Sequence, residues 1–144
     1  MQWVSWFRQF VKFWIGDILG KMTMRVLIID DEAVILEMIC KMLAKEGCDV
    51  LVNPNGVEGL RLIRDESKID ILITDIIMSE KEGMEIIHEI ERDFSHIRIL
   101  AISGKLKYLP IAKVMGADLT LDKPFSKQEL FSAIHQLSKY SLTS

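Results

Sequence analysis

The chain has 144 residues and a formal net charge of −3, with 49% hydrophobic and 27% charged residues. This length suits one domain with a sizeable core, and the composition is that of an ordinary globular protein. The weak negative charge leaves no basic footprint, so we expect no nucleic-acid partner. Cys40 and Cys48 are too few for a disulfide framework or a zinc site, and we expect reduced thiols in a cytoplasmic protein.

Residues 1–21 differ from the rest because they hold all three tryptophans and three of the six phenylalanines. Charged residues interrupt the segment, so we expect neither a membrane-spanning helix nor a secretory signal. We expect an amphipathic extension over residues 1–22, in front of a domain over residues 23–144. Several uses remain open for it: contact with a membrane surface, a second copy or a partner protein, packing on the domain, or an extension read from an upstream start. Helical spacing gives it one broad apolar face, formed by Trp3, Trp6, Phe7, Phe10, Val11, Trp14 and Ile18.

From Met24 onward, short apolar runs alternate with amphipathic stretches that are bounded by turn residues. Gly47 and Gly116 indicate helix ends, and Ser126 indicates a helix start. The pattern predicts strands at about 25–30, 48–52, 70–75, 97–102 and 118–121. It predicts helices at about 33–46, 56–66, 83–93, from Pro110 to Gly116, and 127–139.

This alternation predicts an α/β fold, a doubly wound five-stranded parallel sheet with helices on both faces. Right-handed crossovers leave few arrangements, and we expect the flavodoxin-like strand order 2-1-3-4-5. In that order the first and third strands lie side by side, where the direction of winding reverses. Asp30 and Asp31 follow the first strand and Asp75 ends the third, so we expect these carboxylates to meet in one crevice.

Carboxylates that share one pocket are costly, because two of them about 4 Å apart repel by roughly 4 kcal/mol unless a cation bridges them. Oxygen ligands of this kind suit Mg²⁺. Ser103 follows the fourth strand and Lys123, before Pro124, follows the fifth, so a hydroxyl and an ammonium reach the same edge. A carboxylate nucleophile, a divalent cation, a lysine and a hydroxyl together match the needs of phosphoryl transfer.

The acids, the hydroxyl and the lysine occur in a register that resembles the receiver domain of two-component response regulators, over about residues 24–140. The residues that carry the resemblance are Asp30-Asp31, Asp75, Ser103 and Lys123-Pro124-Phe125. The resemblance implies that Asp75 is the phosphoacceptor and that Ser103 and Lys123 contact the incoming phosphoryl oxygens. It also implies a Mg²⁺ site whose ligands are Asp31 and Asp75, Asp30 through a water molecule, and the backbone carbonyl of Ile77.

In the family, the phosphoryl donor is a histidine kinase or a histidine phosphotransfer protein, and a downstream protein binds the face of the fourth helix, fifth strand and fifth helix. Because the chain ends at Ser144, just past the last predicted helix, we expect a stand-alone receiver that signals by protein–protein contact. One alternative is a receiver-like binding module that acts without phosphorylation. Another is a phosphatase or hydrolase, which Ile77 disfavours because it stands where a second acid would be needed. We expect a cytoplasmic protein, peripheral at the inner membrane surface if residues 1–21 bind lipid.

The sequence departs from the family pattern at several positions. Ser79 stands where a proline is usual, and Thr120 replaces the aromatic residue that lies three positions before the lysine. A threonine cannot swing a ring in and out of the surface, and Tyr108 in the loop after Ser103 is a candidate substitute. Ile77 and Lys105 occupy positions that tune dephosphorylation in relatives.

Overall fold

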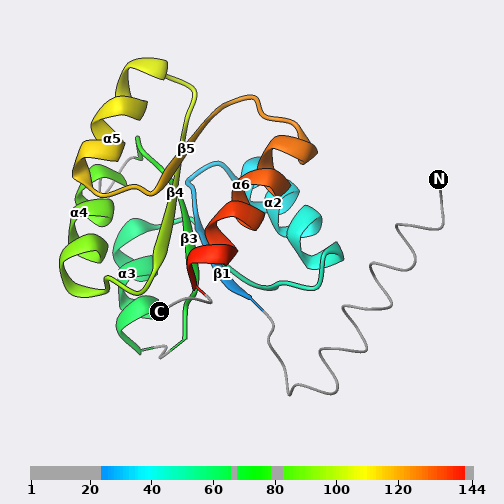
Figure 1. The fold of residues 1–144 in the computed structure, drawn as a ribbon, viewed down its shortest axis with the longest axis horizontal. Helices are drawn as coiled ribbons and strands as arrows, with labels where there is room; N and C mark the ends of the chain where they lie inside the picture. Colours follow the sequence, from blue (N-terminus) through cyan, green and yellow to red (C-terminus); the bar gives the residue numbers. More distant parts are fainter. Residues whose placement is uncertain (1–23, 66–67, 79–82, 142–144) are drawn as a thin grey trace.

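The computed structural model describes residues 24–65, 68–78 and 83–141 (Figure 1). The predicted N-terminal extension and the departure at Ser79 lie outside these residues. The strands are β1 Arg25–Ile29, β2 Asp49–Asn53, β3 Ile71–Asp75, β4 Arg98–Ser103 and β5 Leu119–Asp122. The helices are α2 Ala33–Lys45, α3 Gly56–Asp65, α4 Gly83–Asp93, α5 Leu109–Met115 and α6 Lys127–Ser141, with a short 3₁₀ helix η1 at Leu106–Tyr108.

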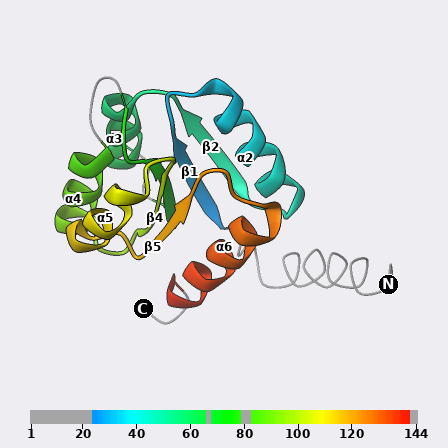
Figure 2. The same ribbon diagram turned by 90° about the horizontal axis from the view of Figure 1, so that it is seen from above.

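The five strands form one sheet in the order β2-β1-β3-β4-β5, and every neighbouring pair is parallel. Helices α2 and α6 cover one face, and α3, α4 and α5 cover the other (Figures 1 and 2). This arrangement confirms the predicted doubly wound, flavodoxin-like fold. It places β1 beside β3 at the centre of the sheet, where the winding reverses.

The core consists of two apolar layers, one on each face of the sheet. Leu27 and Leu72 point toward α3, α4 and α5, whereas Ile28 and Ile73 point toward α2 and α6. These side chains are fully buried, and each contributes roughly 1.5–3 kcal/mol through removal from water. The layers fix the ends of the central strands, and hence the positions of the residues that follow them.

Most predicted boundaries agree within one or two residues, but the segment after Ser103 differs. A 3₁₀ turn precedes α5, with the Tyr108 amide donating to the Lys105 carbonyl at 3.1 Å. The helix then begins at Leu109, one residue before the predicted start, and Pro110 lies in its first turn. Proline is tolerated there because the first amides of a helix have no partner within the helix.

The helix-end signals are confirmed. Gly47 follows α2 with φ +84° and Gly116 follows α5 with φ +126°, both in the left-handed region that favours glycine. Before α6, the Ser126 hydroxyl accepts a hydrogen bond from the Glu129 amide at 3.1 Å. These local signals end or begin the helices where the sequence predicts.

At the amino edge of the sheet, Asp49, Asp70 and Asp118 each have a positive or N–H partner. Asp70 accepts a hydrogen bond from the Arg25 amide, and Asp118 accepts one from the Ile99 amide, both at 2.8 Å. The Arg25 guanidinium lies 3.0 Å from the Asp49 carboxylate, and Arg98 lies 3.6 Å from Asp118. The charges of this edge are therefore balanced locally.

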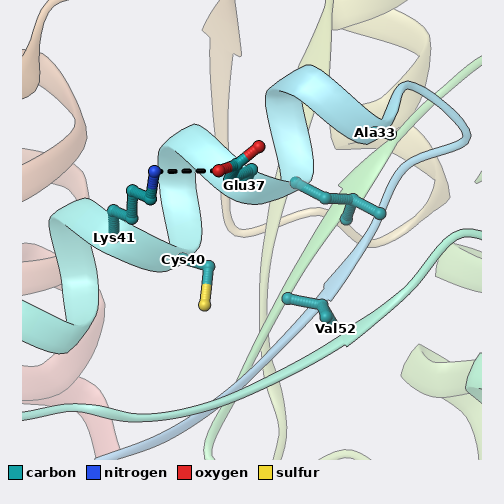
Figure 3. A pocket seen from close by; sticks show the side chains of 6 residues that line it. Ala33, Glu37, Cys40, Lys41 and Val52 are labelled. Atoms are coloured by element: carbon teal, nitrogen blue, oxygen red, sulfur yellow. Dashed lines mark ion pairs between the residues drawn. The ribbon is translucent and has the colours of Figure 1, made fainter.

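A small apolar pocket of about 380 Å³ opens between α2 and the edge strand β2 (Figure 3). Its lining residues are Ala33, Leu36, Glu37, Cys40, Lys41 and Val52. Glu37 and Lys41 form an ion pair at 2.8 Å at its border. No predicted site residue lines the pocket.

Among the described residues, no helix combines the length and apolar character needed to cross a membrane.

Gly83, the first residue of α4, packs directly on the end of β3. Its amide donates to the Ile76 carbonyl at 2.9 Å. A Cβ at this position would contact the Asp75 carbonyl oxygen and lie 2.7 Å from the Ile76 Cα. Because these neighbours are backbone atoms, a side chain at residue 83 would displace the strand end that carries Asp75.

We therefore expect Gly83→Ala to lower the free energy of unfolding by about 1–3 kcal/mol, the usual cost of overpacking. The matched control is Gly104→Ala, because a Cβ at Gly104 meets no atom within 4 Å. Urea denaturation followed by circular dichroism measures both variants. Equal stability of the two variants would contradict the close approach of α4 to β3.

Candidate functional site

Asp30 and Asp75 are neighbours at the carboxyl edge of the sheet. The residue before Asp30, Ile29, pairs in register with Thr74, which precedes Asp75 at the end of β3. Asp30 is fully buried and Asp75 is 5% exposed. Topology thus brings together two carboxylates that are 45 positions apart in sequence, and holds both out of bulk water.

Lys123, directly after β5, places its ammonium between these carboxylates. The Lys123 Nζ lies 2.9 Å from Asp30 Oδ2 and 3.2 Å from Asp75 Oδ2. Its side chain is only 14% exposed. The peptide bond from Lys123 to Pro124 is cis. Three strands therefore contribute one charged group each to a single cluster.

Burial and charge act in opposite directions on this cluster. Burial alone would lower the pKa of Lys123, but the hydrogen bond and charge of Asp30, followed by those of Asp75, raise the pKa above its ordinary value. Burial raises the pKa of Asp30, although the Glu32 amide and the Lys123 ammonium oppose it. The lysine is therefore firmly protonated, and the Asp30 carboxylate carries a desolvation cost that its partners do not fully offset.

Ser103 ends β4 at the same edge and is 1% exposed. Its carbonyl accepts a hydrogen bond from the Lys123 amide at 2.9 Å, which ties the ends of β4 and β5 together. Its hydroxyl accepts from the Lys105 amide at 3.0 Å and donates to the Lys105 carbonyl at 3.3 Å. The hydroxyl thus holds the first turn of the loop that leads to η1.

Of the remaining predicted ligands, Ile77 contacts the cluster through its amide, whereas Asp31 is not among the acids whose oxygens gather there. Asp31 is exposed, and the Ile77 amide donates to Asp75 Oδ1 at 3.3 Å. The ligand roles of Asp30, Asp31, Asp75 and the Ile77 carbonyl stay predictions. The acid that the structure adds is Glu32, whose Oε1 lies 3.2 Å from the Lys123 Nζ. The run of acids from Asp30 to Glu32 could have indicated that Glu32 belongs to the site. A solvent-exposed acid is, however, equally expected at the start of a helix.

The donor set fits a hard divalent cation. One carboxylate oxygen each of Asp30, Glu32 and Asp75 lies within 4.8 Å of the other two. Carboxylate oxygens are the ligands that Mg²⁺ prefers, with water completing the shell. The net charge of these three acids and one lysine is about −2, so a divalent cation would neutralise them.

Comparison with known proteins agrees with this geometry. The sequence model of the response regulator receiver domain matches residues 26–135. A probable transcriptional regulatory protein of Picosynechococcus is 32% identical over 121 residues, which cover 78% of this chain and 48% of the relative. The transcriptional regulatory protein GlrR of Escherichia coli is 32% identical over 111 residues, covering 76% of this chain and 25% of GlrR.

Solved structures show the same likeness. A receiver domain protein from Clostridium thermocellum has a TM-score of 0.78 at 33% identity, covering 84% of this chain and 99% of that one. The response regulator TrrA of Thermotoga maritima, solved with Mg²⁺ and BeF, has a TM-score of 0.74 at 28% identity. There the likeness covers 80% of this chain and 99% of TrrA.

The chain spans half or less of the length of the curated relatives named above, which are transcriptional regulators. The expectations of a stand-alone receiver and of no nucleic-acid partner therefore stay predictions. The fold, the matched span and the acids and lysine at the carboxyl edge agree with one another. This chain belongs to the response regulator receiver domain family, whose members are signalling domains of two-component systems rather than classical enzymes.

Proposed function

We propose that this receiver accepts a phosphoryl group on Asp75 from the phosphohistidine of a histidine kinase or a histidine phosphotransfer protein. The observation that carries the proposal is the Lys123 ammonium, 3.2 Å from Asp75 Oδ2 and 2.9 Å from Asp30 Oδ2. It provides a fixed positive charge beside the carboxylate that would take the phosphoryl group. Phosphoryl transfer depends mainly on positioning and charge neutralisation of this kind.

In the proposed reaction, a carboxylate oxygen of Asp75 forms the new bond to phosphorus while the bond from phosphorus to the donor imidazole breaks. The electron pair of that bond stays on the imidazole nitrogen. Lys123 neutralises part of the charge on the phosphoryl oxygens, and the Ile77 amide, 3.3 Å from Asp75 Oδ1, restrains the nucleophile. The product is an acyl phosphate, whose hydrolysis by the same domain would end the signal.

Magnesium suits the acids that gather at this site. The ligands we propose are Asp30 and Asp75 from that group, with Asp31 and the Ile77 carbonyl beside them. When bound, the cation would offset the negative charge of the carboxylates and of the incoming phosphoryl group. Asp30 and Asp75 are both buried, so little water screens their negative charge.

In this proposal, the Ser103 hydroxyl would link the phosphoacceptor to the outer surface. Its present partners are the amide and carbonyl of Lys105, at the start of the loop that carries η1. Contact with a phosphoryl oxygen would require the hydroxyl to exchange a partner, which would release that loop. A local charge event could in this way alter the position of α5.

A downstream protein would then bind the face of α5, β5 and α6. Large apolar side chains are exposed on η1 and α5, with Leu106 at 63%, Ile111 at 49% and Val114 at 86%. Thr120 of β5 is half-buried, and Tyr108 packs against the core layer of α3, α4 and α5. The use of Tyr108 as a mobile aromatic residue stays a prediction.

The roles predicted for residues 1–21, at a membrane surface, in a dimer or with a partner, also stay predictions, because the segment lies outside the described residues. The same holds for a cytoplasmic location.

Incubation of the full chain with Mg²⁺ and acetyl phosphate should add the mass of one phosphoryl group. We expect Asp75→Asn to abolish the adduct, because the amide is not a nucleophile, and chelation of the cation to suppress it. Asp65→Asn, at the end of α3, is the control and should retain it. Intact-protein mass spectrometry measures the adduct. A phosphorylated Asp75→Asn variant would refute the assignment.

The same site should reduce the stability of the protein without magnesium. Because burial raises the pKa of Asp30, the ionised form is less stable in the folded chain than in the unfolded one. This cost develops as the pH rises from the ordinary value of 3.8 through the raised folded value. Asp30→Asn removes the charge, so we expect a higher Tm at pH 7 in the presence of EDTA, and a smaller difference near pH 3.

Thermal unfolding followed by circular dichroism measures this effect, with Asp31→Asn as the control. Asp31 is exposed, so its neutralisation should change the Tm less. A lower Tm for Asp30→Asn would mean that attraction to Lys123 outweighs the burial cost.

A further inference from the structure

Glu32 is the solvent-side partner of Lys123. Its Oε1 lies 3.2 Å from the Lys123 Nζ, and its side chain is 61% exposed. The other two partners of the ammonium are buried, with side-chain exposures of 0% for Asp30 and 7% for Asp75. The ammonium thus contacts two acids on its buried side and a third acid on its solvent side.

The backbone at the start of α2 directs the Glu32 side chain toward Lys123. Glu32 is the N-cap residue of α2, with an extended backbone at φ −88° and ψ 105°. N-cap side chains commonly bind an amide of their own helix, but the Glu32 side chain makes no such bond. Its amide instead donates to Asp30 Oδ1 at 2.9 Å, while Asp30 Oδ2 binds Lys123. A closed ring therefore joins Asp30, Glu32 and Lys123.

This ring matters because the ammonium and a divalent cation need the same oxygens. Lys123 lies between Asp30 Oδ2 and Asp75 Oδ2, which belong to the acids proposed above as cation ligands. Two positive charges at one pair of carboxylates repel each other. An ammonium with no other partner would have to leave the cluster or weaken cation binding. Glu32 offers it a carboxylate on the solvent side of the cluster.

We propose that Glu32 is a positioning residue that retains the Lys123 ammonium on the solvent side of the cluster while a divalent cation binds Asp30 and Asp75. This inference rests on the proposed function, because it assumes that the acids bind Mg²⁺. It assigns Glu32 a role through Lys123 rather than a catalytic role. The site would then hold both positive charges when the phosphoryl group arrives.

Calorimetric titration of the full chain with Mg²⁺ tests this role without any phosphodonor. Glu32→Gln should raise the Kd for Mg²⁺ about three- to tenfold, by loss of a charge and of the lysine's partner. Glu32→Asp keeps the charge but shortens the arm by one carbon, so we expect an intermediate Kd. Glu37→Gln removes a charge farther along α2, where Glu37 pairs with Lys41, and should change the Kd less than twofold.

The decisive comparison repeats Glu32→Gln in a Lys123→Met background. If Glu32 acts through the lysine, its effect on the Kd should shrink to less than twofold there. An equal effect in both backgrounds, or a wild-type Kd for Glu32→Gln, would overturn the positioning role alone and leave phosphorylation of Asp75 standing. Absence of Mg²⁺ binding by the wild-type chain would overturn the positioning role and the proposed cation site together.

Discussion

The attraction between the Lys123 ammonium and the carboxylates of Asp30 and Asp75 joins the ends of three strands that lie far apart in sequence. Without the ammonium, two carboxylates would face each other out of water with no positive partner. The strand order, the pairing of Ser103 with Lys123 through the backbone, and the close approach of Gly83 to β3 all maintain this contact. The fold thus serves as a rigid frame for one cluster of charges.

In each central strand of this frame, a run of apolar residues is followed directly by the polar end of the strand. Residues Val26 to Ile29 of β1 are fully buried, and the fully buried residue that follows them is the charged Asp30. The same change occurs in β3 between Ile73 and Asp75. Burial of the apolar segments stabilises the fold. This gain offsets the free-energy cost of holding several carboxylates out of water at the strand ends.

Much of the fold could be predicted from the sequence, because its signals are local. Runs such as Val26 to Ile29 predict strands buried on both faces, and parallel topology then places Asp30 beside Asp75. The resemblance to the receiver domain family depends on the polar residues that follow these strands. The contacts of Lys123 required only that β5 lie at the correct edge of the sheet, next to β4.

Two features could not be predicted, the direction of the Glu32 side chain and the 3₁₀ turn before α5. An exposed acid at a helix start, such as Glu32, has no periodic signal in the sequence, and only the folded structure shows its side chain turned toward Lys123. The 3₁₀ turn before α5 is local, closed by the hydrogen bond from the Tyr108 amide to the Lys105 carbonyl, but no composition rule identifies it. Side-chain direction at such exposed positions is set by neighbours that are distant in sequence.

The two edges of the sheet differ in their charge. At the amino edge, arginines and backbone amides offset Asp49, Asp70 and Asp118, whereas at the carboxyl edge one lysine faces a larger group of acids. This local excess of negative charge surrounds Asp30, Glu32 and Asp75. Diffusing cations would be steered toward these acids, and added salt would slow their capture by screening the field.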